Sequence, residues 1–128
     1  MSTKLFFWNV RGLNDPDKHL PFSQWLSSYR PVFGALLEAH IKEQNLSNII
    51  TKVCPGWNFA SNHNSDEDGR IIIIWCQSVS VQLLSQTKQS LTCELTLSPS
   101  QKVVFMAVYA CNTVVERSNL WVDLLNIQ

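Results

Sequence analysis

Residues 4–14, KLFFWNVRGLN, join a short apolar and aromatic run to a turn, and this stretch sets the start of the fold. A run of this length that is broken by Arg11 and Gly12 is typical of a buried strand that ends at a turn. We therefore predict a strand over Leu5–Val10. Its end carries one polar side chain, Asn9, among apolar neighbours.

The same pattern returns in residues 31–40, PVFGALLEAH, where the apolar run Val32–Leu37 delivers Glu38 at its end. Between the two predicted strands, Asp15 can cap a helix that has Pro16 as its first residue. Apolar side chains follow at helical spacing, namely Phe22, Trp25, Leu26 and Tyr29. A second helix is predicted from the same spacing at Leu46, Ile49, Ile50 and Val53. The first half therefore alternates strand and helix.

The second half of the chain favours strands. Trp57–Ala60 and Ile71–Trp75 flank the polar loop Ser61–Gly69, whose Asp68–Gly69 pair is common in hairpin turns. Apolar residues then alternate with polar ones at Val79–Leu83 and Leu91–Leu97. This alternation predicts two strands that each have one buried and one solvent-exposed face. Val103–Val108 is apolar on both faces, which indicates a central strand that ends at Tyr109 and pairs antiparallel with its predecessor. A capping box, Thr113-x-x-Glu116, opens a final helix.

Composition limits what these elements can form. The chain has 128 residues, 45% of them hydrophobic, and ten basic residues balance ten acidic ones. This is enough apolar material for one core, so we expect residues 1–128 to form a single domain. The basic residues stand singly, so we expect any nucleic-acid affinity of these residues to be weak.

The sequence also indicates the cellular compartment of the protein and the redox state of its cysteines. No apolar run has the length that spans a bilayer, and the start of the chain has no signal-peptide pattern, so we expect a nuclear or cytoplasmic protein. The four cysteines never approach C-x-x-C spacing and predict buried, reduced thiols. The three histidines, His19, His40 and His63, are expected at the surface or in loops, and the run Asp66–Asp68 in a solvated loop.

Three polar residues stand at the exits of apolar strands: Asn9, Glu38 and Tyr109. Strand ends of a layered α/β fold gather at one edge of a sheet, where ligands bind. Mg²⁺ needs few protein ligands when waters and phosphate oxygens complete its shell, so Glu38 could hold it. Asn9 could orient a metal-bound water or a phosphate oxygen, and Tyr109 could donate its hydroxyl to a scissile phosphate.

Each of these residues also has a structural interpretation. Glu38 could be a solvated loop carboxylate, and Asn9 could organise the turn by bonding its own backbone. Tyr109 could be a core aromatic whose hydroxyl reaches the rim. Spacing alone does not separate these alternatives.

Four segments together resemble the endonuclease/exonuclease/phosphatase superfamily, which has the DNase I-like fold: FFWNVRGLN, VFGALLEAH, GRIIIIW and VYACNTVVERSNLWVDL. They are most similar to the apurinic-endonuclease-type domain of plant LINE-type non-LTR retrotransposons. The resemblance implies an α/β (α+β) sandwich, a partial four-layer α/β/β/α fold that is mostly the first sheet and its helices. It also implies a Mg²⁺-dependent DNA endonuclease.

The resemblance assigns roles to single residues. It implies that Asn9 lies in the metal and phosphate site and that Glu38 is the metal ligand. It further implies that Tyr109 contacts the phosphate and that Asn112 lies near the nucleic-acid groove.

The sequence departs from this pattern in its later part. The enzymes of the family next need a G-D-x-N segment and then an Asp-His pair, but no glycine follows Gly69 and no histidine follows His63. Residues that act as a unit lose most of the rate when one is removed. We therefore expect a C-terminally truncated domain without independent nuclease activity.

The resemblance also predicts that the inner face of the first sheet lacks a partner. Leaving about 400 Å² of apolar face in water forgoes on the order of 10 kcal/mol, comparable to the stability of a domain. We therefore expect self-association, or a partner chain on that face. A non-catalytic interaction module that docks through this sheet face is the alternative function.

Overall fold

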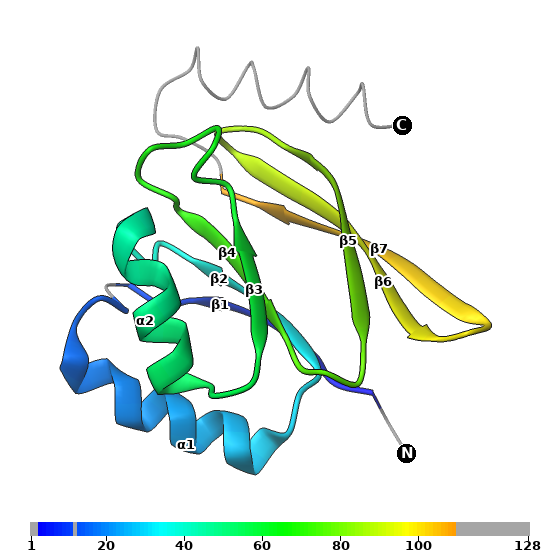
Figure 1. The fold of residues 1–128 in the computed structure, drawn as a ribbon, viewed down its shortest axis with the longest axis horizontal. Helices are drawn as coiled ribbons and strands as arrows, with labels where there is room; N and C mark the ends of the chain where they lie inside the picture. Colours follow the sequence, from blue (N-terminus) through cyan, green and yellow to red (C-terminus); the bar gives the residue numbers. More distant parts are fainter. Residues whose placement is uncertain (1–2, 12, 110–128) are drawn as a thin grey trace.

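The computed structural model describes residues 3–11 and 13–109. In this part of the chain two β-sheets pack face to face, and two α-helices cover the outer face of one of them (Figure 1). The first sheet has the strand order β1-β2-β4-β3, in which β1 and β2 are parallel and the other pairs antiparallel. These strands are β1 (Leu5–Asn9), β2 (Phe33–Leu37), β3 (Asn58–Ser61) and β4 (Ile71–Trp75).

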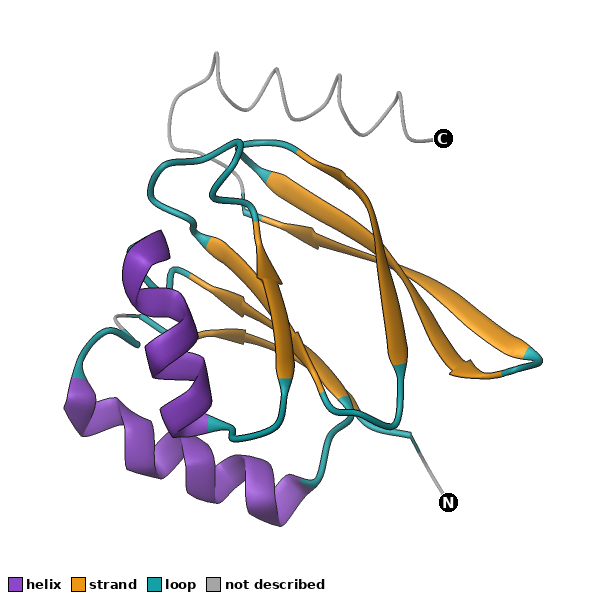
Figure 2. Cartoon of the chain, in the orientation of Figure 1, coloured by secondary structure: helices purple, strands orange, loops and turns teal. Residues whose placement is uncertain are grey.

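The helices lie between the strands of the first sheet along the chain and pack on one of its faces (Figure 2). They are the 3-10 turn η1 (Pro16–Lys18) and the helices α1 (His19–Tyr29) and α2 (Glu43–Val53). The Asp15 carboxylate accepts a hydrogen bond from the backbone N–H of Asp17 at 3.0 Å, which confirms the predicted cap. Pro16, however, begins the 3-10 turn, and the α-helix starts only at His19.

The second sheet consists of β5 (Ser80–Gln86), β6 (Ser90–Ser98) and β7 (Gln101–Val108), all antiparallel, with β6 in the middle. Its inner residues Leu91, Cys93 and Leu95 are fully buried against the first sheet. The inner face of the first sheet is therefore covered, and the expectation that it lacks a partner is wrong. The second half of the chain supplies that cover itself.

Both faces of the central strands are buried, which explains their continuous apolar sequences. In β2 and β4, Leu36, Ile72 and Ile74 face the helices, whereas the alternate residues face the second sheet. The latter are Phe33, Ala35, Leu37, Ile71 and Ile73. The α+β sandwich predicted from the sequence is confirmed.

Two predictions about strand positions are wrong. β1 was expected to be buried, but it lies at the edge of the first sheet within residues 3–109, with Phe7 54% and Trp8 40% exposed. β7 was expected to be central, but it is an edge of the second sheet as described, and Val104 is 60% exposed. An apolar run shows that a strand can be buried on both faces, but it does not tell where the strand lies in the sheet.

The final predicted helix, with Thr113 and Glu116, lies outside the described residues. Among the residues that the structure describes, no helix is long and apolar enough to cross a membrane.

Candidate functional site

Asn9 and Glu38 lie at the same edge of the first sheet because β1 and β2 run parallel. The register pairs Asn9 with Leu37, and the Val10 N–H donates to the Leu37 carbonyl at 2.9 Å. Glu38 follows Leu37 directly in a left-handed conformation, with φ of 54°. Its N–H donates to the carbonyl of Arg70 at 2.9 Å, which holds this unusual backbone in place. The predicted meeting of the two strand ends is confirmed.

Tyr109 reaches the same place from the second sheet. It follows β7 directly, and its N–H donates to the carbonyl of Gln89 at 2.8 Å. Its side chain is hydrogen-bonded to the carboxylate of Glu38. The Arg70 guanidinium carbon lies 5.7 Å from the centroid of the Tyr109 ring. The candidate site is therefore built where the two sheets meet.

A fourth residue of the site is Arg11, for which the sequence pattern predicts only a position in a turn. Its Nε lies 3.1 Å from Oε2 of Glu38. The Arg11 side chain is 80% exposed, whereas that of Glu38 is 18% exposed. Among the described residues, the Arg11 guanidinium contacts the Glu38 carboxylate and is otherwise open to solvent. An anionic ligand could therefore approach it from solvent. Its closeness to Asn9 in the sequence was the one signal that could have placed it here.

These neighbours lower the pKa of Glu38. The hydrogen bond with Tyr109 has the largest effect, and those with Asn9 and Arg11 act in the same direction. Partial burial acts in the opposite direction but does not outweigh them. Glu38 is therefore ionised at neutral pH, as a cation ligand must be.

The donor set suits a hard cation that keeps most of its own water. One carboxylate, one amide and one phenol converge in the site. No group of three or more His, Cys, Asp or Glu side chains is arranged to hold a metal ion within residues 3–109. This excludes a zinc-type cage from the described part but fits Mg²⁺, which binds through one or two carboxylates together with waters and phosphate oxygens. Asn112, expected near a nucleic-acid groove, lies outside the described residues.

Arg70 links the candidate site to the acidic residues of the neighbouring loop. Its guanidinium binds Asp66 Oδ2 at 3.0 Å and Asp68 Oδ2 at 2.9 Å. Asp66 is only 3% exposed, so the prediction of a solvated acidic loop is wrong for this residue. The buried carboxylate is tolerated because Arg70 pairs with it. The same arginine contacts both Glu38, through its backbone, and Tyr109, through its side chain.

Asn62 connects the loop to both sheets. It is completely buried, and its amide nitrogen donates to the carbonyls of Thr87 and Lys88 at 3.1 and 3.2 Å. Its amide oxygen accepts from the N–H of Ile71 at 3.1 Å. No sequence pattern predicts this role, because asparagine is common in polar loops.

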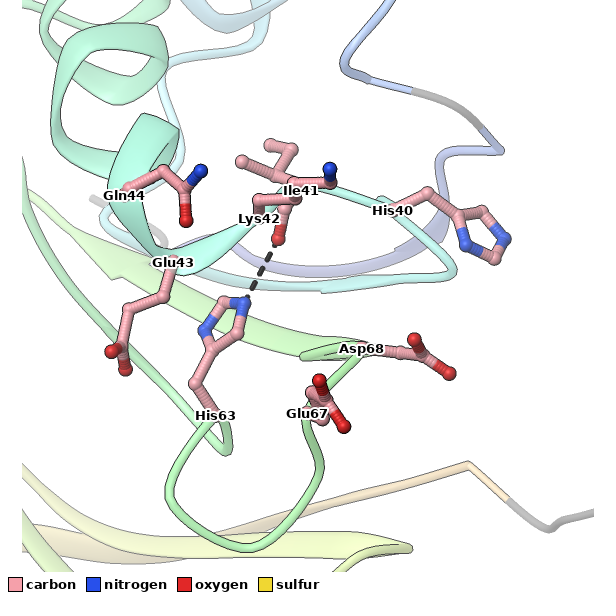
Figure 3. Close-up of a pocket in the computed structure, with 8 residues that line it drawn as sticks. All are labelled: His40, Ile41, Lys42, Glu43, Gln44, His63, Glu67 and Asp68. Atoms are coloured by element: carbon pink, nitrogen blue, oxygen red, sulfur yellow. Dashed lines mark hydrogen bonds between the residues drawn. The ribbon is translucent and has the colours of Figure 1, made fainter.

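The histidines contribute to structure rather than to this site. His19 is buried, with Nε2 2.7 Å from the Leu13 carbonyl oxygen, so its predicted surface position is wrong. His63 donates from Nε2 to the carbonyl of Ile41 at 2.9 Å (Figure 3), and its Nδ1 lies 2.6 Å from the Ser61 hydroxyl. It lines a cavity of about 510 Å³ between the start of α2 and the loop after β3. That cavity has both acidic and basic side chains and is lined by none of the four site residues.

Solved structures, but no sequence families, resemble this chain. No protein-family model matches the chain, and no curated protein sequence matches it. Among solved structures, it is similar to the endonuclease domain of TRAS1, a telomere-specific non-LTR retrotransposon (TM-score 0.67, 5% identity, 98% of this chain and 52% of that one). The AP endonuclease LMAP from Leishmania major gives a TM-score of 0.65 at 16% identity, over 94% and 45% of the two chains.

The human Nocturnin catalytic domain is a third such structure, with a TM-score of 0.56 at 15% identity, over 94% of this chain and 57% of that one. The chain thus spans about half the length of each of these structures. At these identities the likeness establishes the fold, which is the DNase I-like α/β sandwich. The predicted fold class is therefore confirmed.

Proposed function

We propose that this chain is the first part of a nuclease-type phosphodiesterase domain of non-LTR retrotransposon origin, and that Glu38 holds a Mg²⁺ ion in it. The observation that carries the proposal is the convergence of Asn9, Arg11 and Tyr109 on the Glu38 carboxylate. This convergence occurs at the sheet edge of a fold shared with two endonuclease structures. The specific plant LINE-type relationship is part of the same proposal and rests on the sequence resemblance.

The roles follow from the chemistry of the side chains. Glu38 supplies the anionic oxygen to the metal, and the Asn9 amide orients a water or a phosphate oxygen beside it. Tyr109 donates its hydroxyl to the phosphate, and Arg11 neutralises phosphate charge once it is released from Glu38. Bound Mg²⁺ would polarise the phosphate as a Lewis acid. Asn112 would contact the nucleic acid further along the groove.

We further propose that the chain binds metal and phosphate weakly and does not cleave nucleic acid by itself. The site holds one carboxylate in the described residues, and the sequence lacks the G-D-x-N and Asp-His segments. General acid–base groups typically contribute about 10²–10⁴-fold to the rate, so their absence would leave little turnover. The span of about half the length of the similar structures supports the inference that further groups complete the site.

Two measurements on the purified chain test this proposal. Mn²⁺ binding, followed by electron paramagnetic resonance, should be lost in Glu38→Gln but retained in Glu43→Gln, an exposed carboxylate on α2 outside the site. Equal Mn²⁺ binding by both variants would refute the metal role of Glu38. A plasmid-nicking assay with Mg²⁺ should show no cleavage above background, and nicking that Glu38→Ala abolishes would refute the proposed inactivity.

A second candidate, a non-catalytic interaction module, is supported by the edge of β1. This strand has large apolar side chains on both faces, yet it lies at a sheet edge with Phe7 54% exposed. Edge strands of soluble proteins usually carry charges or are covered, because a free apolar edge pairs with other chains. A second copy or a partner strand could pair with β1 and cover Phe7.

Sedimentation equilibrium tests this candidate. The wild-type chain should associate at micromolar concentration, and Phe7→Ser should weaken the association. Leu20→Ser is the matched control, because Leu20 is 66% exposed but belongs to α1 and not to β1. A wild-type chain that is monomeric throughout the concentration series would exclude self-association through β1.

A further inference from the structure

A hollow of about 370 Å³ lies beside the candidate site, between the end of β1 and the start of the helical segment. Its wall is formed by the apolar side chains of Trp8, Pro21 and Phe22, and its rim by Arg11 and Lys18. Its size is within the range of about 300–1,000 Å³ that is usual for small-molecule sites. The hollow is distinct from the cavity around His63, which shares none of its lining residues.

The ring of Trp8 forms an aromatic surface of this hollow, and its contacts with neighbouring rings hold it in position. Its ring stacks on Phe22 at a centroid distance of 5.6 Å and an angle of 29°, and it contacts Trp25 at 5.1 Å. Despite these contacts Trp8 remains 40% exposed. A ring that is held on one side and open on another can stack with a planar ligand at little entropic cost.

The side chains on the rim of the hollow can bind an anionic group once Arg11 is released from Glu38. Arg11 and Lys18 are exposed, and the Lys18 ammonium donates to the Arg11 carbonyl, which keeps the two cations on one rim. Asp17 also lines the hollow, and Glu38 pairs with Arg11, so the two cations face two carboxylates until a metal ion at Glu38 releases Arg11. A ligand that combines a flat apolar part with a phosphate fits this arrangement.

The hollow and the proposed metal site share two residues. Asn9 and Arg11 line the hollow, and both are hydrogen-bonded to Glu38. We propose that the hollow binds a nucleobase, stacked on Trp8, of the nucleotide whose phosphate lies at Glu38 and Arg11. This inference rests on the proposed function and adds a base-binding subsite to it. Because every base has a flat face, the subsite would favour nucleotides without a strict sequence preference.

The test compares 2′-deoxyadenosine 5′-monophosphate with 2-deoxyribose 5-phosphate, which has a hydroxyl group in place of the base. Both are titrated into the ¹⁵N-labelled chain with Mg²⁺, and the dissociation constants are obtained from NMR shifts. Stacking on one aromatic ring corresponds to an affinity gain of about 5-fold or more. The nucleotide should therefore bind at least about 5-fold more tightly, and the Trp8 indole N–H signal should shift only with the nucleotide.

Two variants complete the test. Trp8→Leu keeps an apolar contact with Phe22 and should remove the preference for the nucleotide. Phe7→Ser, an exposed aromatic next to Trp8 that does not line the hollow, should keep it. Equal affinity of both ligands for the wild type, or a preference that persists in Trp8→Leu, would overturn the inference.

The same titration separates this inference from the proposed function. If Glu38→Gln leaves the affinity of both ligands unchanged, then the phosphate is not bound at Glu38 and the proposed function fails. If Glu38→Gln weakens both ligands but the wild type binds them equally, the proposed function stands and the base subsite is excluded. If Trp8→Leu does not fold, nuclear Overhauser contacts between the adenine protons and Trp8 in the wild type decide, and their absence overturns the inference.

Discussion

Arg70 accepts a hydrogen bond from the N–H of Glu38 through its carbonyl oxygen, at 2.9 Å. This bond continues the pairing of β2 with β4 by one residue beyond Leu37 and Ile71. It fixes the left-handed backbone that turns the Glu38 carboxylate toward Asn9, Arg11 and Tyr109. Arg70, which lies between the polar loop and β4, therefore helps to set the geometry of the site.

Replacing Arg70 should destabilise the fold because it leaves Asp66 buried without its cation. Asp66 is 3% exposed and the Arg70 side chain 22% exposed, so we expect Arg70→Leu to lower the free energy of unfolding by about 3 kcal/mol. Urea denaturation measures this change. Adding Asp66→Asn to Arg70→Leu should recover part of the loss, because the only charge then left without Arg70 is that of the exposed Asp68. Equal stability of the single and double variants would contradict the explanation.

The pKa of Glu38 should rise when its hydrogen-bonding partners are removed. The hydrogen bond with Tyr109 makes the largest single contribution, so Tyr109→Phe should raise the pKa of Glu38 most, and Asn9→Ala and Arg11→Gln should each raise it less. Carbon-detected NMR of the Glu38 side-chain carboxyl measures each pKa. A larger rise in Arg11→Gln than in Tyr109→Phe would show that the ion pair, not the phenol, dominates.

The depressed pKa of Glu38 also predicts how stability depends on pH. A carboxyl whose pKa is lower in the folded state stabilises the fold above its ordinary pKa, near 4.5, and loses this contribution as pH falls through the folded value. Glu38→Gln should therefore show a flatter fall of unfolding free energy below pH about 4.5 than the wild type. Parallel profiles for Glu38→Gln and the wild type would contradict this linkage.

Much of the fold and part of the site could be predicted from the sequence. The apolar runs that end at Asn9 and Glu38 located two strands, and their parallel arrangement brings these side chains together. Periodicity could not reveal that β1 and β7 are edges, because strand order depends on long-range pairing. Arg11 and Asn62 were missed because their partners are distant in sequence and become neighbours only on folding.

Asn62 should be far more important for stability than its exposed neighbour Asn64. Asn62→Ala removes three hydrogen bonds and leaves the buried N–H of Ile71 without its acceptor. An unsatisfied buried group costs about 1–3 kcal/mol, so we expect a loss of about 2–3 kcal/mol in unfolding free energy. Asn64→Ala should change it by less than about 0.5 kcal/mol, as surface substitutions usually do. Similar urea midpoints for the two variants would contradict the role of Asn62.

Gly34 should be intolerant of even one added methyl group because the Phe6 ring lies where its Cβ would be. The two residues are paired across β1 and β2, and Phe6 is held by Trp25 at a centroid distance of 5.0 Å. Gly34→Ala should therefore destabilise the fold by about 1–3 kcal/mol, through displacement of the ring.

The double variant Gly34→Ala/Phe6→Leu tests the cause of this effect. A leucine leaves room for the new methyl group, so the double variant should be more stable than the sum of the two single effects by at least about 0.5 kcal/mol. Urea denaturation of the four proteins of this cycle gives the coupling energy. Strict additivity would contradict the explanation that Gly34 is required for the space that the Phe6 ring occupies.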